Sequence, residues 1–220
     1  MSEARAGTGG RLLTGVAWAA LLFALWLWGR EVTEVPSGSW TATGDVAAAG
    51  RPPALELPPP HPPLPGATPQ RLAIRAMGLR APIEGRGLTR EGAAEPPPYD
   101  RAGTVAWYRG GPQPGSPGAA VLVGHVDTDS APAVFYELGG LKRGETVSVA
   151  RADGSTAEFT VDDVAVFSKD HFDAGRVYGP HAAGRAELRL ITCGGDYDRV
   201  RRQYSANVVV SAYLTGTGPA

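Results

Sequence analysis

The sequence predicts an all-β domain, a β-barrel or β-sandwich of about 150 residues, over residues 70–216. Eight short apolar or alternating runs follow residue 70, and turn residues such as Gly, Asp and Pro separate them. The dipeptide Asp153-Gly154 lies between two alternating runs, which is a strong signal for a β-hairpin. Only residues 133–141 have apolar side chains near helical spacing, so we expect helices to contribute little.

An apolar run precedes this domain. Residues 12–28 contain no charged side chain, and a run of that length is just sufficient to cross a hydrocarbon core of about 30 Å. A cleaved signal peptide is the alternative, but its apolar region is usually shorter, and tryptophans favour an interfacial anchor. Arg5 and Arg11 precede the run and only Arg30 follows it closely, so residues 1–11 are expected in the cytoplasm. The prediction is a single-pass protein of the cell membrane with an extracellular domain.

Residues 29–69 are expected to link the apolar run to the domain. Nine prolines occur between positions 52 and 69, and proline neither donates a backbone hydrogen bond nor fits a helix interior. This composition predicts a semi-rigid polyproline spacer that lifts the domain away from the bilayer. An SH3-type ligand is the alternative interpretation, and His61 within the segment is expected to be a solvated residue.

The expected elements of the domain are short and closely spaced. The strands are predicted over residues 72–77, 81–85, 103–108, 119–126, 145–150, 157–167, 186–193 and 204–214. Residues 133–141 predict a short helix that a glycine pair ends. The stretch 168–183 is rich in turn residues and predicts a loop, which either covers a site at the strand ends or lies beside it.

Composition and missing motifs exclude several classes of function. The formal net charge of −1 predicts no concentrated basic surface, so we expect no nucleic-acid partner. No CxxC or HExxH spacing is present, and no P-loop, dinucleotide fingerprint or Gly-x-Ser-x-Gly motif occurs, so we expect no metal and no cofactor. Asp127, Asp129, Asp162 and Asp163 lack the spacing of a calcium loop and are expected to be solvated turn carboxylates.

Cys193 is the one cysteine of the chain. It ends an apolar run and precedes two glycines, so the thiol is expected at a partly exposed strand end beside a turn. Arginines lie on both sides of it in the sequence, and nearby positive charge favours the nucleophilic thiolate. A small buried structural cysteine is the alternative.

His125 closes the apolar run that begins at Ala119 and precedes a polar step, so its ring could reach a neighbouring strand end. A hydrogen-bonded turn histidine is the alternative, because most histidines are not catalytic even though they titrate near neutral pH. His171 and His181 lie in the predicted loop, where no strand orients them, and they are weaker candidates.

Taken together, these residues resemble the sortases, the cysteine transpeptidases of Gram-positive cell surfaces. The resemblance covers about residues 71–214 and is strongest for VLVGHVDT, AVFYELGGLKRGETVSV, VYGPHAAGRAELRLITCGG and NVVVSAYL, in that order. These segments look most like the class F and class E groups of high-GC bacteria. The resemblance implies a closed eight-stranded β-barrel with one or two short helices, and a histidine, a cysteine and an arginine gathered at one end.

The resemblance also assigns site residues. His125 matches the GH motif, Cys193 matches the TC motif, and Thr192 beside it is assigned to substrate binding. The family's arginine usually lies at the start of the last strand, where this chain has Ser-Ala-Asn at 205–207. Arg202 is the nearest arginine and takes the catalytic assignment, with Arg199 and then Arg201 as alternatives. Arginine also replaces the first threonine of the family's Thr-Leu-x-Thr-Cys pattern, at position 189.

The activity that the resemblance implies is transpeptidation. The Cys193 thiolate would attack the Thr–Gly bond of an LPxTG-like or LAxTG-like sorting signal on a secreted protein and form a thioacyl enzyme. His125 would act as general acid and base, and Arg202 would bind the oxyanion or the signal. The acyl group would pass to an amine of a cell-wall precursor or of another protein. Two alternatives stay open: a thiol hydrolase, and a non-enzymatic wall-binding module with a structural cysteine.

Overall fold

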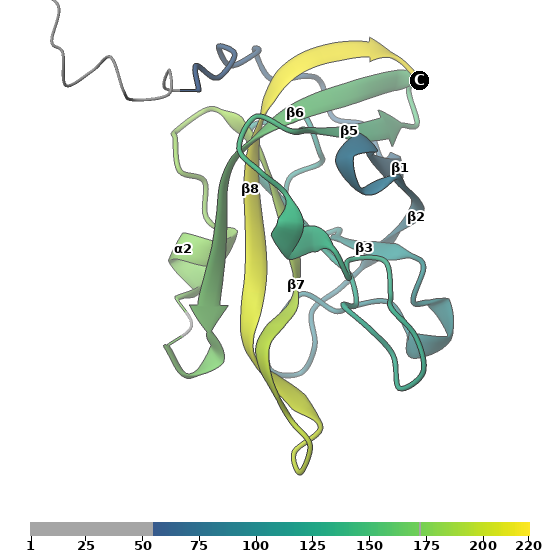
Figure 1. Cartoon of the computed structure of the whole chain (residues 1–220). Coiled ribbons are helices and arrows are strands. Elements are labelled where there is room, and N and C mark those ends of the chain that lie inside the picture. Colours follow the sequence, from purple (N-terminus) through teal and green to yellow (C-terminus); the bar gives the residue numbers. More distant parts are fainter. Residues whose placement is uncertain (1–54, 172) are drawn as a thin grey trace, which may run out of the picture. The chain divides into compact units, whose positions relative to one another are not determined.

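A computed structural model of the chain describes residues 55–171 and 173–220 (Figure 1). The predicted cytoplasmic segment 1–11, the predicted membrane span 12–28 and most of the predicted spacer lie outside these residues. Across the described ranges, the structure contains no helix with the length and apolar character that a membrane crossing requires. The membrane anchor therefore stays a prediction.

Eight strands within the described ranges form a closed barrel in the order β1-β2-β3-β4-β7-β8-β6-β5. The strands are β1 Pro69–Ile74, β2 Leu79–Arg86, β3 Val105–Tyr108, β4 Gly118–Val123, β5 Thr146–Arg151, β6 Ser155–Ser168, β7 Ala186–Asp198 and β8 Gln203–Pro219. The pairs β2–β3 and β4–β7 are parallel and the other six are antiparallel. The prediction of a closed eight-stranded barrel is confirmed, and the β7–β8 hairpin projects beyond the other strands (Figure 1).

The predicted turn at Asp153-Gly154 joins β5 to β6. Gly154 has φ 81°, a left-handed conformation that glycine adopts without a side-chain clash. The Asp153 carboxylate accepts a hydrogen bond of 3.0 Å from the Ser155 backbone N–H, as short polar side chains do in turns. This local chemistry explains why the dipeptide was a reliable signal.

Alternate side chains of the strands fill two apolar clusters. The larger cluster occupies the barrel interior and includes Leu122, Leu190 and Val210. The smaller cluster lies on the opposite face of β4, β7 and β8 and includes Val123, Ile191 and Val209. The short helix α2 Ala174–Tyr178 contributes buried Val177 to this second cluster, so the two faces of these central strands are both covered.

The predicted helix over residues 133–141 is wrong in most of its length, since only a 3-10 turn forms there, Leu138–Gly140. Within this stretch, the N–H groups of Tyr136, Leu138 and Gly140 donate to carbonyls three residues earlier, as in 3-10 turns, and not four residues earlier as in an α-helix. The N–H groups of Ala133 and Phe135 join the start of the stretch to the carbonyls of Val126 and His125, both at 3.0 Å.

Conversely, α2 forms inside the stretch predicted as a loop. Asp173 caps it by accepting bonds from the N–H groups of Gly175 at 2.9 Å and Arg176 at 3.2 Å. A helix of five residues is too short to leave a periodic apolar signal in the sequence.

The described part of the predicted spacer, residues 55–68, lies against the barrel. The Pro58 carbonyl accepts a bond of 2.6 Å from the Tyr213 hydroxyl, and the His61 N–H donates to the Leu214 carbonyl at 2.8 Å. The guanidinium of Arg151, which is buried, donates to the Pro65 carbonyl. Prolines lack a backbone donor but keep their carbonyls, so a proline-rich segment can still bind to a strand edge through its acceptors. Residues 55–68 therefore do not act as an extended spacer, and the spacer prediction now applies only to residues before 55.

Candidate active site

Strand pairing relates the positions of the two predicted catalytic residues. In the parallel pair of β4 and β7, Val123 lies opposite Ile191, and the Gly124 N–H then donates to the Ile191 carbonyl at 3.1 Å. His125 and Cys193 each lie two residues beyond this pair, so both belong to the same end of the two neighbouring strands.

Residues on the next two strands are paired with Cys193 in turn. In β8, Asn207 lies opposite Cys193, and in β6, Phe167 lies opposite Asn207. Residues paired in this way share one face of a sheet. We call the set of His125, Cys193, Asn207 and Phe167 the catalytic row, and it lies on the outer face of the barrel beside the smaller apolar cluster, in which Phe167 takes part.

Thr192 points to the other face from this row. Its side chain is only 4% exposed, and its hydroxyl donates to the Gly124 carbonyl at 2.8 Å. The bond joins the end of β7, which carries Cys193, to the end of β4, which leads to His125. The assignment of Thr192 to substrate binding stays a prediction, and in this structure its hydroxyl makes a structural bond.

Glycine is needed in the GH motif for packing. A Cβ atom on Gly124 would lie 2.7 Å from side-chain carbons of both Val134 and Phe135. These two residues belong to the turn that replaces the predicted helix, and Phe135 is fully buried. The absence of a side chain at position 124 therefore lets this turn approach the strand that carries His125.

The imidazole of His125 is held by two residues that the sequence did not single out. Its ring stacks on Tyr99, with centroids 4.3 Å apart and planes 20° apart. Its Nε2 lies 2.7 Å from the Pro97 carbonyl, which can only accept a hydrogen bond, so Nε2 carries a proton. In neutral His125 this leaves Nδ1 as the ring nitrogen that can take up a proton.

Cys193 is half-buried, and its Sγ lies 3.9 Å from the Nζ of Lys169. The turn predicted after the cysteine is a β-bulge, because the β7–β8 register shifts between Gly194 and Tyr197. Gly195 in this bulge has φ 78°, and a Cβ on it would lie 2.5 Å from the Ser205 Oγ. A side chain at position 195 would therefore clash, so the shape of the bulge requires glycine at this position.

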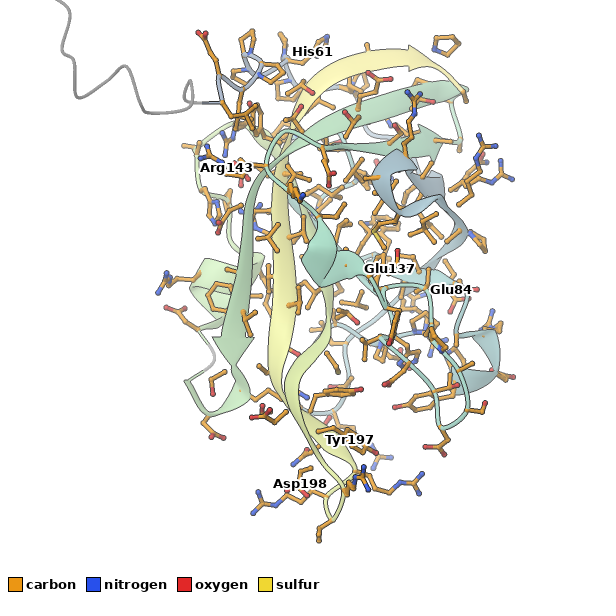
Figure 2. All side chains as sticks on the ribbon, viewed as in Figure 1. His61, Glu84, Glu137, Arg143, Tyr197 and Asp198 are labelled. Atoms are coloured by element: carbon orange, nitrogen blue, oxygen red, sulfur yellow. The ribbon has the colours of Figure 1, made fainter. Side chains whose placement is uncertain are left out.

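A cleft of about 860 Å³ opens onto Cys193. It is lined by residues 127–130 and 202–204, and by Tyr99, Lys169, Cys193 and Tyr197. Figure 2 shows Tyr197 and Asp198 on the projecting hairpin at one end of the barrel, with His61 at the other end. The cleft thus contains the predicted nucleophile, the aromatic ring that stacks on His125, and one of the predicted arginines.

The three candidate arginines lie in or beside the turn of the β7–β8 hairpin. Arg202, at φ 53°, lines the cleft, and its Nη2 donates to both carboxylate oxygens of Asp129 at 2.8 Å. These bonds and the negative charge raise the pKa of Arg202 above its usual value. Arg201 lies 3.8 Å from the Asp198 carboxylate, and neither it nor Arg199 is among the described residues that line the cleft.

Comparison with known proteins supplies the identity. A family model described as the Sortase domain matches residues 72–215. The chain belongs to the sortase family. Family and fold together identify this sortase as a cysteine transpeptidase. A search of curated proteins found no relative that matches it.

Solved sortases share the fold of this sortase. The sortase C-1 of Actinomyces oris is 22% identical, with a TM-score of 0.51 over 66% of this chain and 73% of that chain. The sortase A of Listeria monocytogenes is 15% identical, with a TM-score of 0.52 over 70% of this chain and 92% of that chain. The sortase C1 of Streptococcus agalactiae, in complex with MTSET, is 21% identical, with a TM-score of 0.51 over 67% of each chain. The resemblance to classes F and E stays a prediction.

Two polar contacts close one wall of the sortase cleft. The Tyr204 hydroxyl donates to the Asp127 carboxylate, and this hydrogen bond, with burial and the negative charge, raises the pKa of Tyr204 to about 12. Arg202 and Asp129 make the second contact. Both join the loop after β4 to the β7–β8 hairpin, so these aspartates are bonded and not merely solvated. Within the described residues, no three potential metal-ligating side chains gather.

Proposed function

We propose that this sortase cleaves an LPxTG-like or LAxTG-like sorting signal between Thr and Gly and transfers the acyl part to an amine. The observation that supports the proposal is that the directly paired strands β4 and β7 lead to His125 and Cys193 at one end of the barrel, where Cys193 lines an open cleft. A nucleophile within reach of a base that other groups orient is the arrangement that covalent acyl transfer requires.

In the proposed reaction, the Cys193 sulfur attacks the threonine carbonyl and the peptide C–N bond breaks. His125 takes the thiol proton at Nδ1 and gives it to the departing glycine amine, so the charge balances at each step. An incoming amine then attacks the thioester, His125 removes its proton, and the thiol leaves. The bond from Nε2 to the Pro97 carbonyl and the stack on Tyr99 support this role, because they orient the ring while Nδ1 exchanges the proton.

Arg202 is proposed to hold the signal in the cleft. Its position on the rim beside Tyr197 and Tyr204 supports contact with an extended peptide, and the cleft volume is typical of ligand sites, which range over about 300–1,000 Å³. Arg199 is the alternative, since it lies in the same turn. Binding of the signal would compete with Asp129 for the Arg202 guanidinium.

We further propose that residues 12–28 anchor the chain in the cell membrane with the barrel outside. Secreted proteins that carry a sorting signal, and lipid-linked cell-wall precursors that offer an amine, both reach the outer face of the membrane. A membrane-anchored barrel would meet both partners there. The acceptor is a cell-wall precursor or an amine of another surface protein.

The test uses the full chain in detergent micelles with an LPxTG or LAxTG peptide and an amine acceptor, followed by mass spectrometry. Ligated product is expected with the wild type and none with Cys193→Ala. His125→Asn is expected to lower the rate by at least about 100-fold, the usual contribution of a general acid and base. Hydrolysed peptide in place of ligated product, unchanged by added amine, would favour the thiol hydrolase. No cleavage of either signal would refute the proposed specificity.

A further inference from the structure

The side chain bonded to the Cys193 sulfur in this structure is a lysine. The Nζ of Lys169 lies 3.9 Å from Sγ. In the sequence, the position that the family pattern reserves for arginine is occupied by residues 205–207, none of which is cationic. Asn207 stands directly opposite Cys193 in the catalytic row and is neutral. The positive charge at this sulfur therefore comes from outside the last strand, from the 3-10 turn that follows β6.

Strand pairing explains how Lys169 reaches the thiol. Phe167 near the end of β6 pairs with Asn207, and Ser168 pairs with Ala206, so the end of β6 runs alongside the residues that face Cys193. Lys169 directly follows β6 as the first residue of the 3-10 turn Lys169–His171, so it leaves the strand beside the residues that face Cys193. From there its Nζ lies within 3.9 Å of the sulfur.

Two arginines near Cys193 in the sequence have other partners. Arg189 is buried and donates to the Glu187 carboxylate at 2.6 Å. Arg202 binds both carboxylate oxygens of Asp129. Lys169, by contrast, takes part in none of the ion pairs found among the described residues, and it lines the cleft together with Cys193. Its charge is therefore directed to the sulfur and not to a carboxylate.

We propose that Lys169 is a catalytic residue that supplies the positive charge for the Cys193 thiolate, in place of an arginine on the last strand. The inference rests on the proposed function, in which Cys193 is the nucleophile. The thiol proton passes to His125, the sulfur becomes negative, and the Lys169 ammonium offsets that charge while keeping its own protons. Attack on the threonine carbonyl then consumes the sulfur's charge as the C–S bond forms.

The ammonium state also matters after the thioester has formed. A neutral Lys169 amine so close to the sulfur would itself attack the thioester and leave a permanent amide on the enzyme. The acyl group would then be lost to the intended acceptor. Protonated Lys169 cannot attack, so the same charge that assists the first step protects the intermediate in the second.

The experiment measures the rate at which iodoacetamide, a neutral reagent, alkylates the single cysteine of the full chain in detergent at fixed pH, by intact mass. Lys169→Met is expected to slow alkylation about tenfold, which corresponds to about 1.4 kcal/mol, the size of one charge-assisted contact. Lys169→Arg is expected to stay near the wild-type rate. Lys142→Met is the matched control, because it removes the only other lysine of the chain, which is exposed, and is expected to change nothing.

A double variant with the positive charge at another position distinguishes the effect of the charge from the effect of the lysine side chain's shape. Adding Asn207→Arg to Lys169→Met places a guanidinium in the catalytic row, and recovery of the alkylation rate is expected. In peptide transfer, Lys169→Met is expected to lower kcat while KM changes little. Thermal unfolding of each variant checks that the barrel is intact.

Three results would overturn the inference. The first is a wild-type alkylation rate in Lys169→Met. The second is a rate in both Lys169→Arg and the double variant that is as slow as in Lys169→Met, and the third is acyl product attached to Lys169 in the wild type. The proposed function can fail separately. If no sorting signal is transferred while alkylation still depends on the charge at Lys169, the role of Lys169 beside the thiolate is supported and the proposed substrate is wrong.

Discussion

The buried ion pair of Glu187 and Arg189 on β7 predicts the largest stability effect of a single substitution. Both side chains are nearly inaccessible, with 0% of each residue exposed. The Glu187 carboxylate accepts four hydrogen bonds: from the backbone N–H groups of His181 and Ala182, both at 2.9 Å, from Arg185 at 2.9 Å, and from Arg189 at 2.6 Å. Glu187→Ala removes all four and leaves the Arg189 guanidinium buried without its counter-charge.

Removing one partner of a buried pair costs about 3–5 kcal/mol, which for a domain of this size lowers Tm by roughly 6–20 °C. The assay is urea and thermal unfolding of Glu187→Ala beside the wild type. Glu158→Ala, at an exposed position of β6, is the matched control and is expected to change the unfolding free energy by less than about 0.5 kcal/mol. A loss of unfolding free energy below about 1 kcal/mol in Glu187→Ala would show that the buried pair does not stabilise the fold to this extent.

The same pair predicts the direction of a pH dependence. Burial alone raises the pKa of Glu187, but bonds from the His181 N–H, from Arg189 and from the Ala182 N–H outweigh burial and hold it below its ordinary value of 4.5. A carboxyl whose folded pKa is lowered stabilises the fold above pH 4.5, and that contribution is lost as the pH falls through the folded value. The unfolding free energy of the wild type should therefore fall on acidification by more than that of Glu187→Gln. Equal slopes would contradict this.

Three further substitutions test the local geometry of the site. Gly195→Ala is expected to destabilise the fold by about 1–3 kcal/mol and to slow alkylation of the adjacent thiol, since a residue at φ 78° with a Cβ 2.5 Å from Ser205 Oγ must shift the bulge. Thr192→Val loses the bond to the Gly124 carbonyl and should cost about 1 kcal/mol in urea unfolding, with no effect if that bond is absent. Tyr99→Leu keeps an apolar side chain but removes the aromatic stack that orients His125, so kcat for transfer should fall; an unchanged kcat would exclude an orienting role.

Much of the barrel could be predicted because its signals are local. Alternating runs and the Asp153-Gly154 dipeptide each depend on a few neighbouring residues, and the strands formed near the predicted positions. An α-helix did not form at residues 133–141, because the start of that stretch is bonded to distant carbonyls and its later N–H groups bond to carbonyls three residues earlier, which periodicity does not reveal. The last part of the spacer was misplaced for the same reason, since its contacts are with Tyr213 and Leu214 at the other end of the chain.

The site residues also divide into those with a local sequence signal and those placed by long-range contacts. His125 and Cys193 could be singled out because each closes an apolar run, and the parallel pairing of β4 with β7 puts the ends of both runs at one end of the barrel. Lys169 gave no such signal, because its proximity to the thiol depends on β8 lying between β6 and β7 with one particular register. Tyr99 lies in a long connection between β2 and β3, where proline-rich sequence marks a loop without showing what it contacts.

The most direct test of covalent catalysis is the intact mass of the full chain after incubation with a sorting-signal peptide and no amine. A mass increase equal to the acyl part of the peptide up to threonine is expected, sensitive to hydroxylamine as thioesters are, and absent in Cys193→Ala. Added amine should discharge this species and yield ligated peptide. Cleavage of the peptide without an acyl adduct, or an adduct that persists in Cys193→Ala, would contradict the assignment of Cys193 as the nucleophile.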